Sequence, residues 1–458
     1  MARGVKKDKA DKVLTPEERL AAALVPVEEQ PYEVPGNWCW VYLGNVSEII
    51  MGQSPEGMAT TDDASYIPLI GGAADMGELY PETKRYTKIP TKVSRTDDVI
   101  ICIRATLGRP IYSDGEYCLG RGVAAIRSKK LIKGFIRYGF MTFEQSLFDN
   151  ATGTTFGQIT NSYLNKMPFP LPPLAEQQRI VDRIESLFAK LDEAKEKAQA
   201  VVDGFEDRKA AILHKAFTGE LTRKWREKHG VYLGQWVIKK LKDCGKWMGG
   251  GTPSMSHPEY WENGDILWIT SKDMKSDLIE NTMMRMNQEG IMNSTANYCN
   301  KPSVLFVMRS GILRRTLPIA MVKKPFTVNQ DLKAIAPDEI DIDYLFWACK
   351  NKEKQMLKAC MKSGTTVESI NTAALMEFEL PVALKDEQPF IVSTILNLLM
   401  KVEQARDNAE QVIKQINDIK KSILARAFRG ELGTNDPTDN NAEEQLKQIL
   451  IKEVSICI

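Results

Sequence analysis

The sequence contains one unit twice, and this repeat constrains the possible fold more than any other feature. Residues 153–159 (GTTFGQI) match residues 364–370 (GTTVESI), 211 positions later. The same offset relates residues 213–221 (LHKAFTGEL) to residues 424–432 (LARAFRGEL). A period of roughly 200 residues is far too long for a solenoid of short repeats. The chain is therefore predicted to hold one duplicated unit, not a row of small ones.

Upstream of these segments the offset between the copies is smaller. It is 198 residues, pairing Trp38 with Trp236 and Pro55 with Pro253. The difference between the two offsets means that the second copy is about 13 residues longer between its start and its Gly-Thr-Thr segment.

The first part of each copy is predicted to be a mixed α+β domain. Short apolar runs rich in β-branched residues lie at 98–103 and 122–126, and at 303–308 in the second copy, interrupted by Gly and Pro. Such runs predict strands, while residues 134–149 and 341–361 predict helices. The expected fold class is therefore α+β.

The second part of each copy predicts a long helix, over about residues 174–217 and 385–428. Apolar residues recur in both at alternating spacings of three and four, the period of a coiled-coil seam. A helix lying alone on a globular body is the alternative, but the same period in both copies favours pairing of the two helices. The predicted seam consists of Ile184, Leu187, Leu191, Ala194, Ala198, Val201, Phe205, Ile395, Leu398, Val402, Ala405, Ala409, Val412, Ile416, Ile419 and Ile423.

Connectivity predicts how these helices run. A first helix of about 44 residues would carry the chain about 65 Å from one domain to the next. The second begins where the second domain ends, so it must run back. We expect an antiparallel coiled coil with a globular domain at each end and an internal pseudo-twofold axis.

The chain is thus predicted to have six segments. They are an N-terminal extension, partly disordered (1–35), a first globular domain (36–173), a central long helix (174–222), a second globular domain (223–382), a distal long helix (383–432) and a flexible C-terminal tail (433–458).

The net charge of +1 hides an uneven distribution. Segment 81–140 has 13 basic and five acidic residues, and segment 301–330 has six basic residues and no acidic one. Residues 174–217 are balanced, with eight basic and nine acidic. Two basic globular domains joined by neutral helices are typical of a protein that neutralises phosphates, although a solvated mixed surface is the alternative.

Other features argue for a cytoplasmic protein without its own chemistry. No signal peptide or membrane-spanning run is present, and the eight cysteines form no CxxC pair. With three histidines, a zinc site lacks ligands at a plausible spacing. There is no GxxxxGK[ST] phosphate loop, and residues 249–253 and 51–55 are predicted to be tight turns after a first strand. No metal site, cofactor site or catalytic set is expected in this chain.

At this point the motifs resemble a known family, the DNA-specificity (S) subunits of type I restriction-modification systems. The resemblance covers about residues 14–432. It is carried by residues 250–254 (GGTPS) and 260–270 (YWENGDILWIT), by 52–55 (GQSP) and 67–77 (IPLIGGAADMG), and by 171–180 (LPPLAEQQRI). The second copy lacks the double proline before its long helix and has Pro389 in the first helical turns, which leaves the start of that helix open.

The resemblance implies a non-catalytic, sequence-specific DNA-binding subunit. Two target-recognition domains would each read one half of a bipartite site in double-stranded DNA, while the helices set the gap and dock two methyltransferase (M) subunits. The complex would methylate adenine with S-adenosylmethionine. With restriction (R) subunits it would use ATP and Mg to translocate and cleave DNA. All of these cofactors would lie on the partner subunits.

Basic and polar residues of both domains are the candidates for facing DNA. Arg104 and Arg309 stand out because each follows an equivalent strand. The Gly-Thr-Thr threonines could contact phosphate or simply form a turn. The predicted set is Lys84, Arg85, Arg104, Arg109, Arg121, Thr154, Thr155, Arg309, Arg314, Arg315, Gln330, Thr365 and Thr366.

Two other readings of the chain stay open. One is a coiled-coil scaffold whose globular ends bind protein partners. The other is an enzyme whose active site leaves no recognisable motif.

Overall fold

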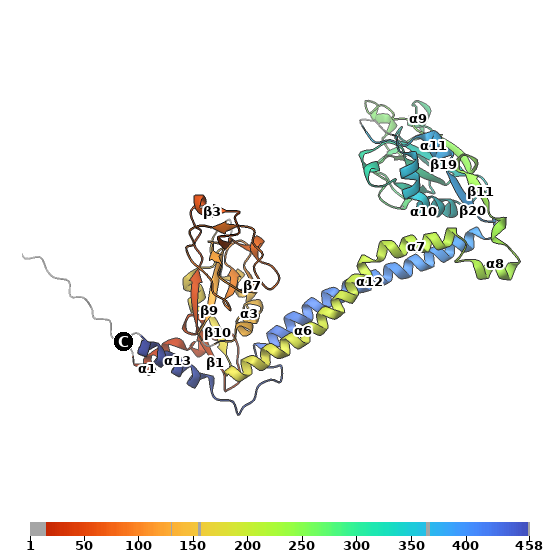
Figure 1. Cartoon of the computed structure of the whole chain (residues 1–458). Coiled ribbons are helices and arrows are strands. Elements are labelled where there is room, and N and C mark those ends of the chain that lie inside the picture. Colours follow the sequence, from red (N-terminus) through yellow and green to blue (C-terminus); the bar gives the residue numbers. More distant parts are fainter. Residues whose placement is uncertain (1–14, 130, 154–156, 363–366, 457–458) are drawn as a thin grey trace, which may run out of the picture. The chain divides into compact units, whose positions relative to one another are not determined.

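A computed structural model describes residues 15–129, 131–153, 157–362 and 367–456 of the chain. It contains two compact units (Figure 1). Unit 1 comprises Met1–Lys197 with Val412–Ile458, and unit 2 comprises Ala198–Gln411. Both units combine helices with mixed sheets, so the predicted α+β class is confirmed.

Unit 1 has three small sheets, with strand orders β2-β9-β6-β7, β3-β5-β4-β8 and β1-β10. The four buried residues of β6 and the first four of β9 form its centre. Its strands and shorter helices are α1 (Pro16–Ala23), β1 (Cys39–Tyr42), α2 (Leu43–Val46), β2 (Ser47–Met51), β3 (Thr60–Thr61), β4 (Ile67–Ile70), β5 (Tyr86–Thr87), β6 (Val99–Cys102), β7 (Gly108–Tyr112), β8 (Cys118–Leu119), β9 (Val123–Ser128), α3 (Lys133–Thr142), α4 (Glu144–Asp149), α5 (Asn161–Lys166), β10 (Pro168–Leu171) and α13 (Ala442–Ile456).

Unit 2 has the strand orders β12-β19-β16-β17-β14, β15-β13-β18 and β11-β20. Its strands and shorter helices are α8 (Arg223–His229), β11 (Val237–Lys240), β12 (Gly245–Gly249), β13 (Ile266–Ile269), β14 (Leu278–Ile279), β15 (Met284–Met286), α9 (Gln288–Met292), β16 (Ser303–Val307), β17 (Ile319–Val322), β18 (Phe326–Val328), β19 (Leu332–Pro337), α10 (Ile342–Cys360), α11 (Thr372–Met376) and β20 (Glu379–Val382).

The sheets of the two units correspond strand by strand. The order β2-β9-β6-β7 recurs as β12-β19-β16-β17, β5-β4-β8 recurs as β15-β13-β18, and β1-β10 recurs as β11-β20. In both units one strand pair is parallel, β4 with β8 and β13 with β18, and β8 and β18 each follow an antiparallel hairpin, β6–β7 and β16–β17. The sequence repeat is therefore also a repeat of topology.

The predicted first long helix is interrupted. It consists of α6 (Leu174–Asp203) and α7 (Phe205–Phe217), separated at Gly204. The guanidinium of Arg208 donates to the carbonyl oxygen of Val201 at 2.7 Å. In an unbroken helix that carbonyl would accept from the N–H of Phe205. The prediction of one continuous helix over residues 174–217 is therefore wrong at Gly204, where the helix is interrupted.

The second long helix, α12 (Gln388–Ala427), has 40 residues without a break. It begins at Gln388, with Pro389 in the first turn, where proline costs little because its missing N–H would have no partner in the helix. The start of this helix, which the sequence left open, is therefore Gln388, one residue before the proline.

Of the sixteen predicted seam positions, five are buried, seven are partly buried and four are exposed. Ile184, Ala198, Ile395, Ala409 and Ile416 are buried. The exposed positions are Ala194, Ala405, Val412 (40 % exposed) and Ile419 (46 % exposed), and there the prediction is wrong.

Next to two of these exposed positions, Ala405 and Ile419, a cationic side chain of α12 packs on an aromatic ring of another helix. Within unit 2 the guanidinium of Arg406 lies 4.5 Å from the ring centre of Phe205 on α7. Within unit 1 the ammonium of Lys420 lies 4.7 Å from the ring centre of Phe188 on α6 and pairs with Asp192. The long stems of Lys and Arg cover apolar surface while their charged ends reach polar or aromatic partners. A count of apolar residues alone misses such positions.

Each unit also buries a glutamate–glutamine pair at the foot of a long helix. Gln177 accepts from the N–H of Ile132 and donates to the carbonyl of Pro172, both at 3.0 Å. Gln388, 211 residues later, accepts from Asp341 and donates to Ala383, both at 2.8 Å. The pair therefore ties each helix to its own globular domain in the same way.

The glutamates beside them are closed by segments from elsewhere in the chain. Glu176, fully buried, accepts from the hydroxyl of Thr434 at 2.7 Å and from the guanidinium of Arg179. Arg179 also pairs with Asp439. Thr434 and Asp439 follow α12, so the C-terminal segment completes unit 1.

In unit 2 the segment after α7 has this role. Glu387, also fully buried, accepts from Thr222 at 2.6 Å, from Arg226 at 2.7 Å and from the indole N–H of Trp236 at 2.8 Å. The Arg226 guanidinium lies 5.7 Å from the Trp236 ring centre.

The predicted flexible tail is wrong over most of its length. Residues 442–456 form α13, which packs against α1, and Ala442, Leu446 and Leu450 belong to the hydrophobic core of unit 1. The N–H of Ala442 donates to the carbonyl of Asn37 at 3.0 Å. The apolar spacing of four residues in this tail predicts an amphipathic helix. The residues before this helix, 433–441, are polar and typical of a flexible segment, which is why the tail as a whole is predicted to be flexible.

Among the described residues, no helix combines the length and the low polarity that crossing a lipid bilayer requires.

Candidate DNA interface

The two Gly-rich motifs lie against equivalent turns of the two units. In unit 1, residues 52–55 follow β2 and run beside the turn between β8 and β9; the N–H of Gln53 donates to the carbonyl of Leu119 at 2.7 Å. A Cβ on Gly52 would lie 2.1 Å from the carbonyl oxygen of Gly120, and one on Gly250 would lie 1.5 Å from that of Val328. Glycine is required at both positions because the backbones touch.

Two residues beyond each glycine, a hydroxyl contacts the same turn. Ser54 Oγ accepts from the backbone N–H of Arg121 at 3.2 Å and from its Nε at 3.3 Å. In unit 2 the hydroxyl of Thr252 donates to Gln330 Oε1. Arg121 and Gln330 are exposed and occupy the middle of the turns β8–β9 and β18–β19. The structure thus brings these two predicted residues to equivalent places, each held by the hydroxyl before a proline.

Lys84 and Arg85 lie beside this turn in unit 1. Arg85 donates to Asp75, a buried carboxylate that also accepts from the N–H of Gly71 at 2.7 Å. The guanidinium covers Gly71, since a Cβ there would lie 2.6 Å from Arg85 Nη2. Lys84 is exposed and forms no ion pair with any residue of the described ranges.

The corresponding place in unit 2 has two methionines in addition to polar and charged side chains. Asp273 accepts from the N–H of Thr270 at 2.9 Å, as Asp75 accepts from the N–H of Gly71, but its second backbone donor is the N–H of Met283 at 3.0 Å, where Asp75 accepts from the Arg85 guanidinium. Met283 and Met284 occupy the positions that Lys84 and Arg85 have in unit 1. The threonine before each pair marks this correspondence, because Thr83 donates to the carbonyl of Arg85 and Thr282 to that of Met284. A cavity of about 290 Å³ lies between the methionines and the turn; it is lined by Trp268, Thr270, Ser271, Lys272, Met283, Met284, Asn329 and Asp331.

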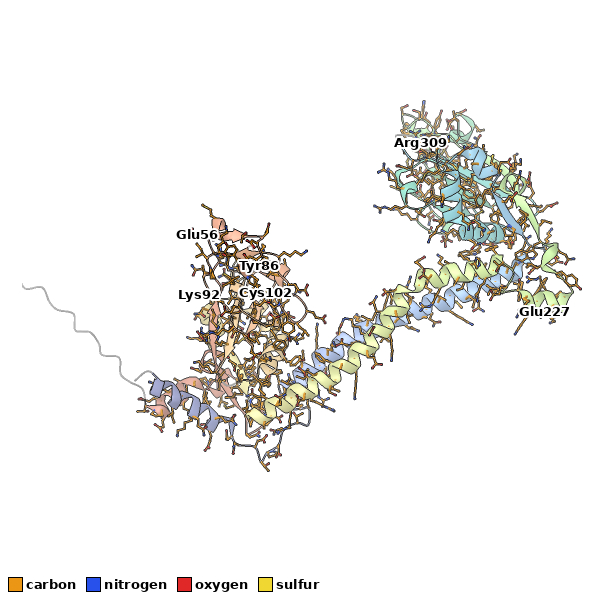
Figure 2. All side chains as sticks on the ribbon, in the orientation of Figure 1. Glu56, Tyr86, Lys92, Cys102, Glu227 and Arg309 are labelled. Atoms are coloured by element: carbon orange, nitrogen blue, oxygen red, sulfur yellow. The ribbon has the colours of Figure 1, made fainter. Side chains whose placement is uncertain are left out.

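Arg104 and Arg309 also lie at matching positions. Each forms an isolated antiparallel bridge, Arg104 with Gln158 and Arg309 with Ser369. Both arginines are exposed. Figure 2 shows Arg309 at the end of its domain away from α12. The prediction that they follow equivalent strands is confirmed, and the bridges place each beside the segment that follows a Gly-Thr-Thr sequence.

Two of the remaining predicted arginines have intramolecular partners, and the third is exposed. Arg109 donates to the carbonyls of Ala73 and Met76 at 3.3 and 3.2 Å, and thereby braces the turn after β4. Arg314 pairs with Glu368, and this hydrogen bond holds the pKa of the Glu368 carboxyl below its usual value. Arg315 is exposed. Thr154, Thr155, Thr365 and Thr366 lie outside the described residues.

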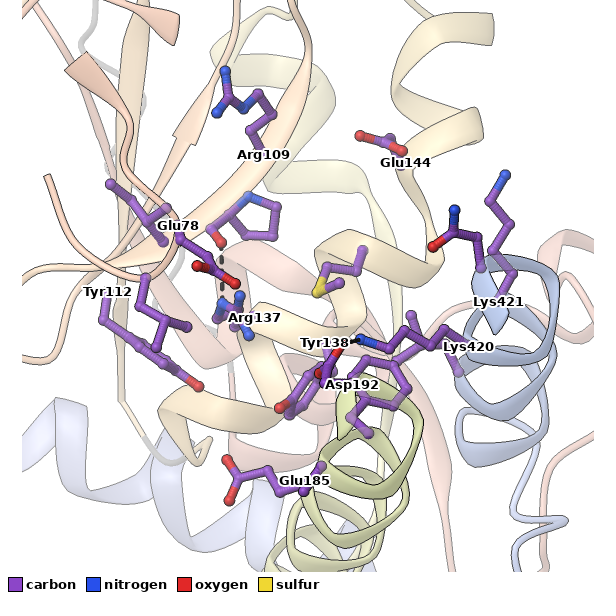
Figure 3. Close-up of a pocket in the computed structure, with 18 of the residues that line it drawn as sticks. Glu78, Arg109, Tyr112, Arg137, Tyr138, Glu144, Glu185, Asp192, Lys420 and Lys421 are labelled. Atoms are coloured by element: carbon purple, nitrogen blue, oxygen red, sulfur yellow. Dashed lines mark hydrogen bonds and ion pairs between the residues drawn. The ribbon is translucent and has the colours of Figure 1, made fainter. Parts of the chain in front are cut away.

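A larger cavity of about 900 Å³ lies in unit 1 between the globular domain and the long helices (Figure 3). Its charges are mixed. Burial raises the pKa of Tyr138 to about 12 and also raises that of Tyr112, so both phenols stay neutral. The charged residues that line it are Arg109, Arg137, Lys420, Lys421, Glu78, Glu144, Glu185 and Asp192. Its four carboxylates make this cavity a poor site for a phosphate backbone.

The described ranges contain no group of three or more His, Cys, Asp or Glu side chains able to hold a metal ion. Burial raises the pKa of Cys102 and of Cys244 to about 11 and that of Cys39 to about 12, so these thiols stay protonated at neutral pH.

Comparison with known proteins agrees with this geometry. Residues 35–202 and 234–415 match the family described as "Type I restriction modification DNA specificity domain". The two matches cover both copies of the repeat and most of the chain. The chain belongs to this family.

Relatives in the family are specificity subunits. The chain is 32 % identical over 246 residues to the type I restriction enzyme EcoR124I/EcoR124II specificity subunit of Escherichia coli, covering 52 % of this chain and 56 % of that one. It is 23 % identical over 435 residues to the EcoKI specificity subunit of Escherichia coli K12, covering 87 % and 90 %. In its first three matches the chain spans only about half the length of the curated relatives, 56, 44 and 41 %.

Solved structures share the fold. The HsdS subunit from Thermoanaerobacter tengcongensis is similar with a TM-score of 0.60 and 20 % identity, covering 89 % of this chain and all of that one. A chain from a structure of a type I restriction-modification system gives a TM-score of 0.63 at 19 % identity, covering 88 % and 100 %.

Proposed function

We propose that this chain is the DNA-specificity subunit of a type I restriction-modification complex, and that it is itself non-catalytic. The observation that carries the proposal is the pair of equivalent turns β8–β9 and β18–β19. Each presents one exposed polar side chain, and the two side chains, Arg121 and Gln330, differ in chemistry. A protein that reads an asymmetric, two-part site needs the same scaffold twice with different residues at its reading positions. Double-stranded DNA would be the ligand, with one half-site for each domain.

The long helices would set the distance between the half-sites. Within unit 1, Lys420 of α12 contacts α6, and within unit 2, Arg406 of α12 contacts α7. We propose that these contacts belong to one antiparallel coiled coil with pseudo-twofold symmetry, which also docks two methyltransferase subunits. S-adenosylmethionine would bind to those subunits, and ATP and Mg to restriction subunits.

Reconstitution with the methyltransferase subunits of its own system tests this proposal. The full chain and these subunits are purified, combined and incubated with genomic DNA, and methylated adenines are mapped by single-molecule sequencing. We expect methylation at one bipartite sequence, dependent on the chain. Methylation or cleavage by the chain alone would support an enzyme instead. Capture of protein partners with no binding to duplex DNA would support a scaffold.

A change of helix length tests the spacing role. One extra helical turn in both α6 and α12 adds about 5.4 Å to each. Since base pairs are stacked about 3.4 Å apart, the unread gap should lengthen by about one or two base pairs, with the same bases read. Altered bases with a constant gap would contradict the proposal.

A further inference from the structure

The two turns β8–β9 and β18–β19 carry one exposed side chain each, Arg121 and Gln330, at the same structural position. We propose that these two residues are the paired base readers of the two domains, Arg121 reading a guanine in one half-site and Gln330 an adenine in the other. The hydroxyls of Ser54 and Thr252 position them. This inference rests on the proposed function and names the side chains and the bases that it leaves open.

The free ends of both side chains suit a base edge. Ser54 occupies the backbone N–H and Nε of Arg121, and no residue of the described ranges bonds to its two terminal nitrogens. These two nitrogens form the fork that matches O6 and N7 of guanine in the major groove. Thr252 bonds to Oε1 of Gln330, and the amide nitrogen has no partner in the described part of the chain. Oε1 keeps a second lone pair that can accept from N6–H of adenine, while the amide NH2 can donate to N7.

The neighbouring residues favour the same assignment independently. In unit 1, Arg85 covers Gly71, and Gly71 packs on Gly122, the residue after Arg121. In unit 2, Met283 and Met284 lie across a cavity from Asn329 and Asp331, the residues on either side of Gln330; Lys272 and Asp331 put one charge of each sign on the lining of this cavity. A cationic neighbour adds to an arginine that donates to guanine, because guanine presents two acceptors, O6 and N7. Methionines provide an apolar surface for the thymine methyl group, the partner of adenine in an A·T pair.

The motif before each proline has a physical explanation in this geometry. The glycine lets the backbone approach the turn, and the hydroxyl two residues later reaches the reader. A side chain on an exposed turn would otherwise sample many rotamers, and ordering it on binding would cost affinity. A hydroxyl that bonds to one side of the reader reduces this cost. Ser54 and Thr252 are therefore positioning residues, not readers.

Exchange of the readers is the test, in the full chain assembled with its methyltransferase subunits. Methylated adenines are mapped for Arg121→Gln and for Gln330→Arg. We expect the first to lose its preference for G·C at one position of one half-site, and the second to lose its preference for A·T at one position of the other. Each preference should fall about five- to a hundredfold, while every other position stays as in the natural protein.

Two control variants distinguish the loss of a base contact from a general change in the charge or polarity of the domain. Arg95→Gln removes an exposed cation from the same domain as Arg121, and Gln288→Ala removes an exposed amide from the same domain as Gln330. Neither should change the bases read. If the exchanged readers leave both half-sites unchanged while the natural complex methylates a bipartite site, this inference fails and the proposed function stands. If the natural complex methylates no such site, the proposed function fails.

The positioning role has its own readout. Thr252→Val removes the hydroxyl at nearly constant size, and Thr252→Ser keeps it. The valine variant should lose discrimination at the same base as Gln330→Arg and at no other base, and the serine variant should restore it. A loss at every position of that half-site would show a general defect in folding and would contradict a positioning role. Unchanged discrimination in the valine variant would contradict it as well.

Discussion

The buried clusters at Glu176 and Glu387 are the same motif 211 residues apart, but they differ in how they are closed. Around Glu387 the arginine is enclosed, with the side chain of Arg226 only 7 % exposed. Around Glu176 the side chain of Arg179 is 37 % exposed and shares its charge between Glu176 and Asp439. Unit 2 is closed by an internal segment, and unit 1 by the C-terminal segment of the chain. Two copies of one sequence motif can therefore contribute differently to the free energy of unfolding.

The largest effect is expected at the enclosed cluster. Glu387→Gln would leave the guanidinium of Arg226 buried without its carboxylate, and a buried ion pair that loses one partner typically costs about 3–5 kcal/mol. Hydrogen exchange measured by mass spectrometry should show lost protection in unit 2 but not in unit 1. The matched control is Asp386→Asn, an exposed neighbour that should have little effect. Equal loss in both units would contradict separate closure.

The next largest effect is expected in the segment that closes unit 1. Leu446 is fully buried in the core, so Leu446→Ala should cost about 2–4 kcal/mol through lost burial and a cavity. Protection should fall in α13, α1 and the start of α6, while unit 2 keeps its protection. Gln448→Ala on the exposed face of α13 is the control. A melting temperature unchanged by Leu446→Ala would mean that α13 adds nothing to the closure.

A smaller change, of about 1 kcal/mol or less at neutral pH, is expected for Glu176→Gln, because Arg179 keeps Asp439 as a partner and the neutral amide avoids the cost of burying a charge. Burial raises the pKa of Glu176 above its usual 4.5, so the folded state holds this proton more tightly than the unfolded state. The resulting stability is fully present below about pH 4.5 and is lost as the pH rises through the raised pKa.

Denaturant titrations from pH 4 to 7 check this sign. Removal of the titrating group should flatten the stability of unit 1 over this range relative to the natural chain. Glu196→Gln, an exposed change on the same helix, should leave the pH profile as it is. A natural chain whose unit 1 gains stability with rising pH, through this group alone, would contradict the assignment.

The smallest effect is expected where cations meet aromatic rings between the helices. Lys420→Met keeps the apolar stem but loses the charge over Phe188, and Arg406→Met does the same over Phe205. Each should cost about 0.5–1 kcal/mol, in unit 1 and in unit 2 respectively. Lys421→Met, at an exposed neighbouring position, provides the baseline. An increase in stability from both changes would mean that aliphatic residues suit these positions better.

Much of the architecture could be predicted from the sequence. The repeat, the α+β class and the two arginines after equivalent strands are all present in the structure, whereas residues 52–55 and 250–253, predicted to be tight turns, are irregular segments without a turn. The helix seam was predictable at the positions that are buried or partly buried, but a pattern of apolar residues does not detect Lys420 and Arg406, which pack through their side-chain stems. The break at Gly204 depends on Arg208 bonding to the Val201 carbonyl, which spacing alone does not indicate.

The site was predictable as a set of residues but not as an arrangement. Arg121 and Gln330 were both candidates, yet nothing in their numbers links them, because they are 209 residues apart while their motifs are 198 apart. Ser54 and Thr252 were seen only as parts of turns. The signal that could have found them is a hydroxyl before the proline in both copies of the motif.

By itself, the sequence determined that this protein is one unit used twice, with basic domains and long helices, because periodicity and composition are properties of neighbouring residues. Only the tertiary structure decided which hydroxyl bonds to Arg121 and to Gln330. It also decided which distant segment covers each of the buried glutamates, Glu176 and Glu387. Those pairings join residues from 67 to about 260 positions apart. They depend on how strands and turns meet in space, which local pattern does not encode.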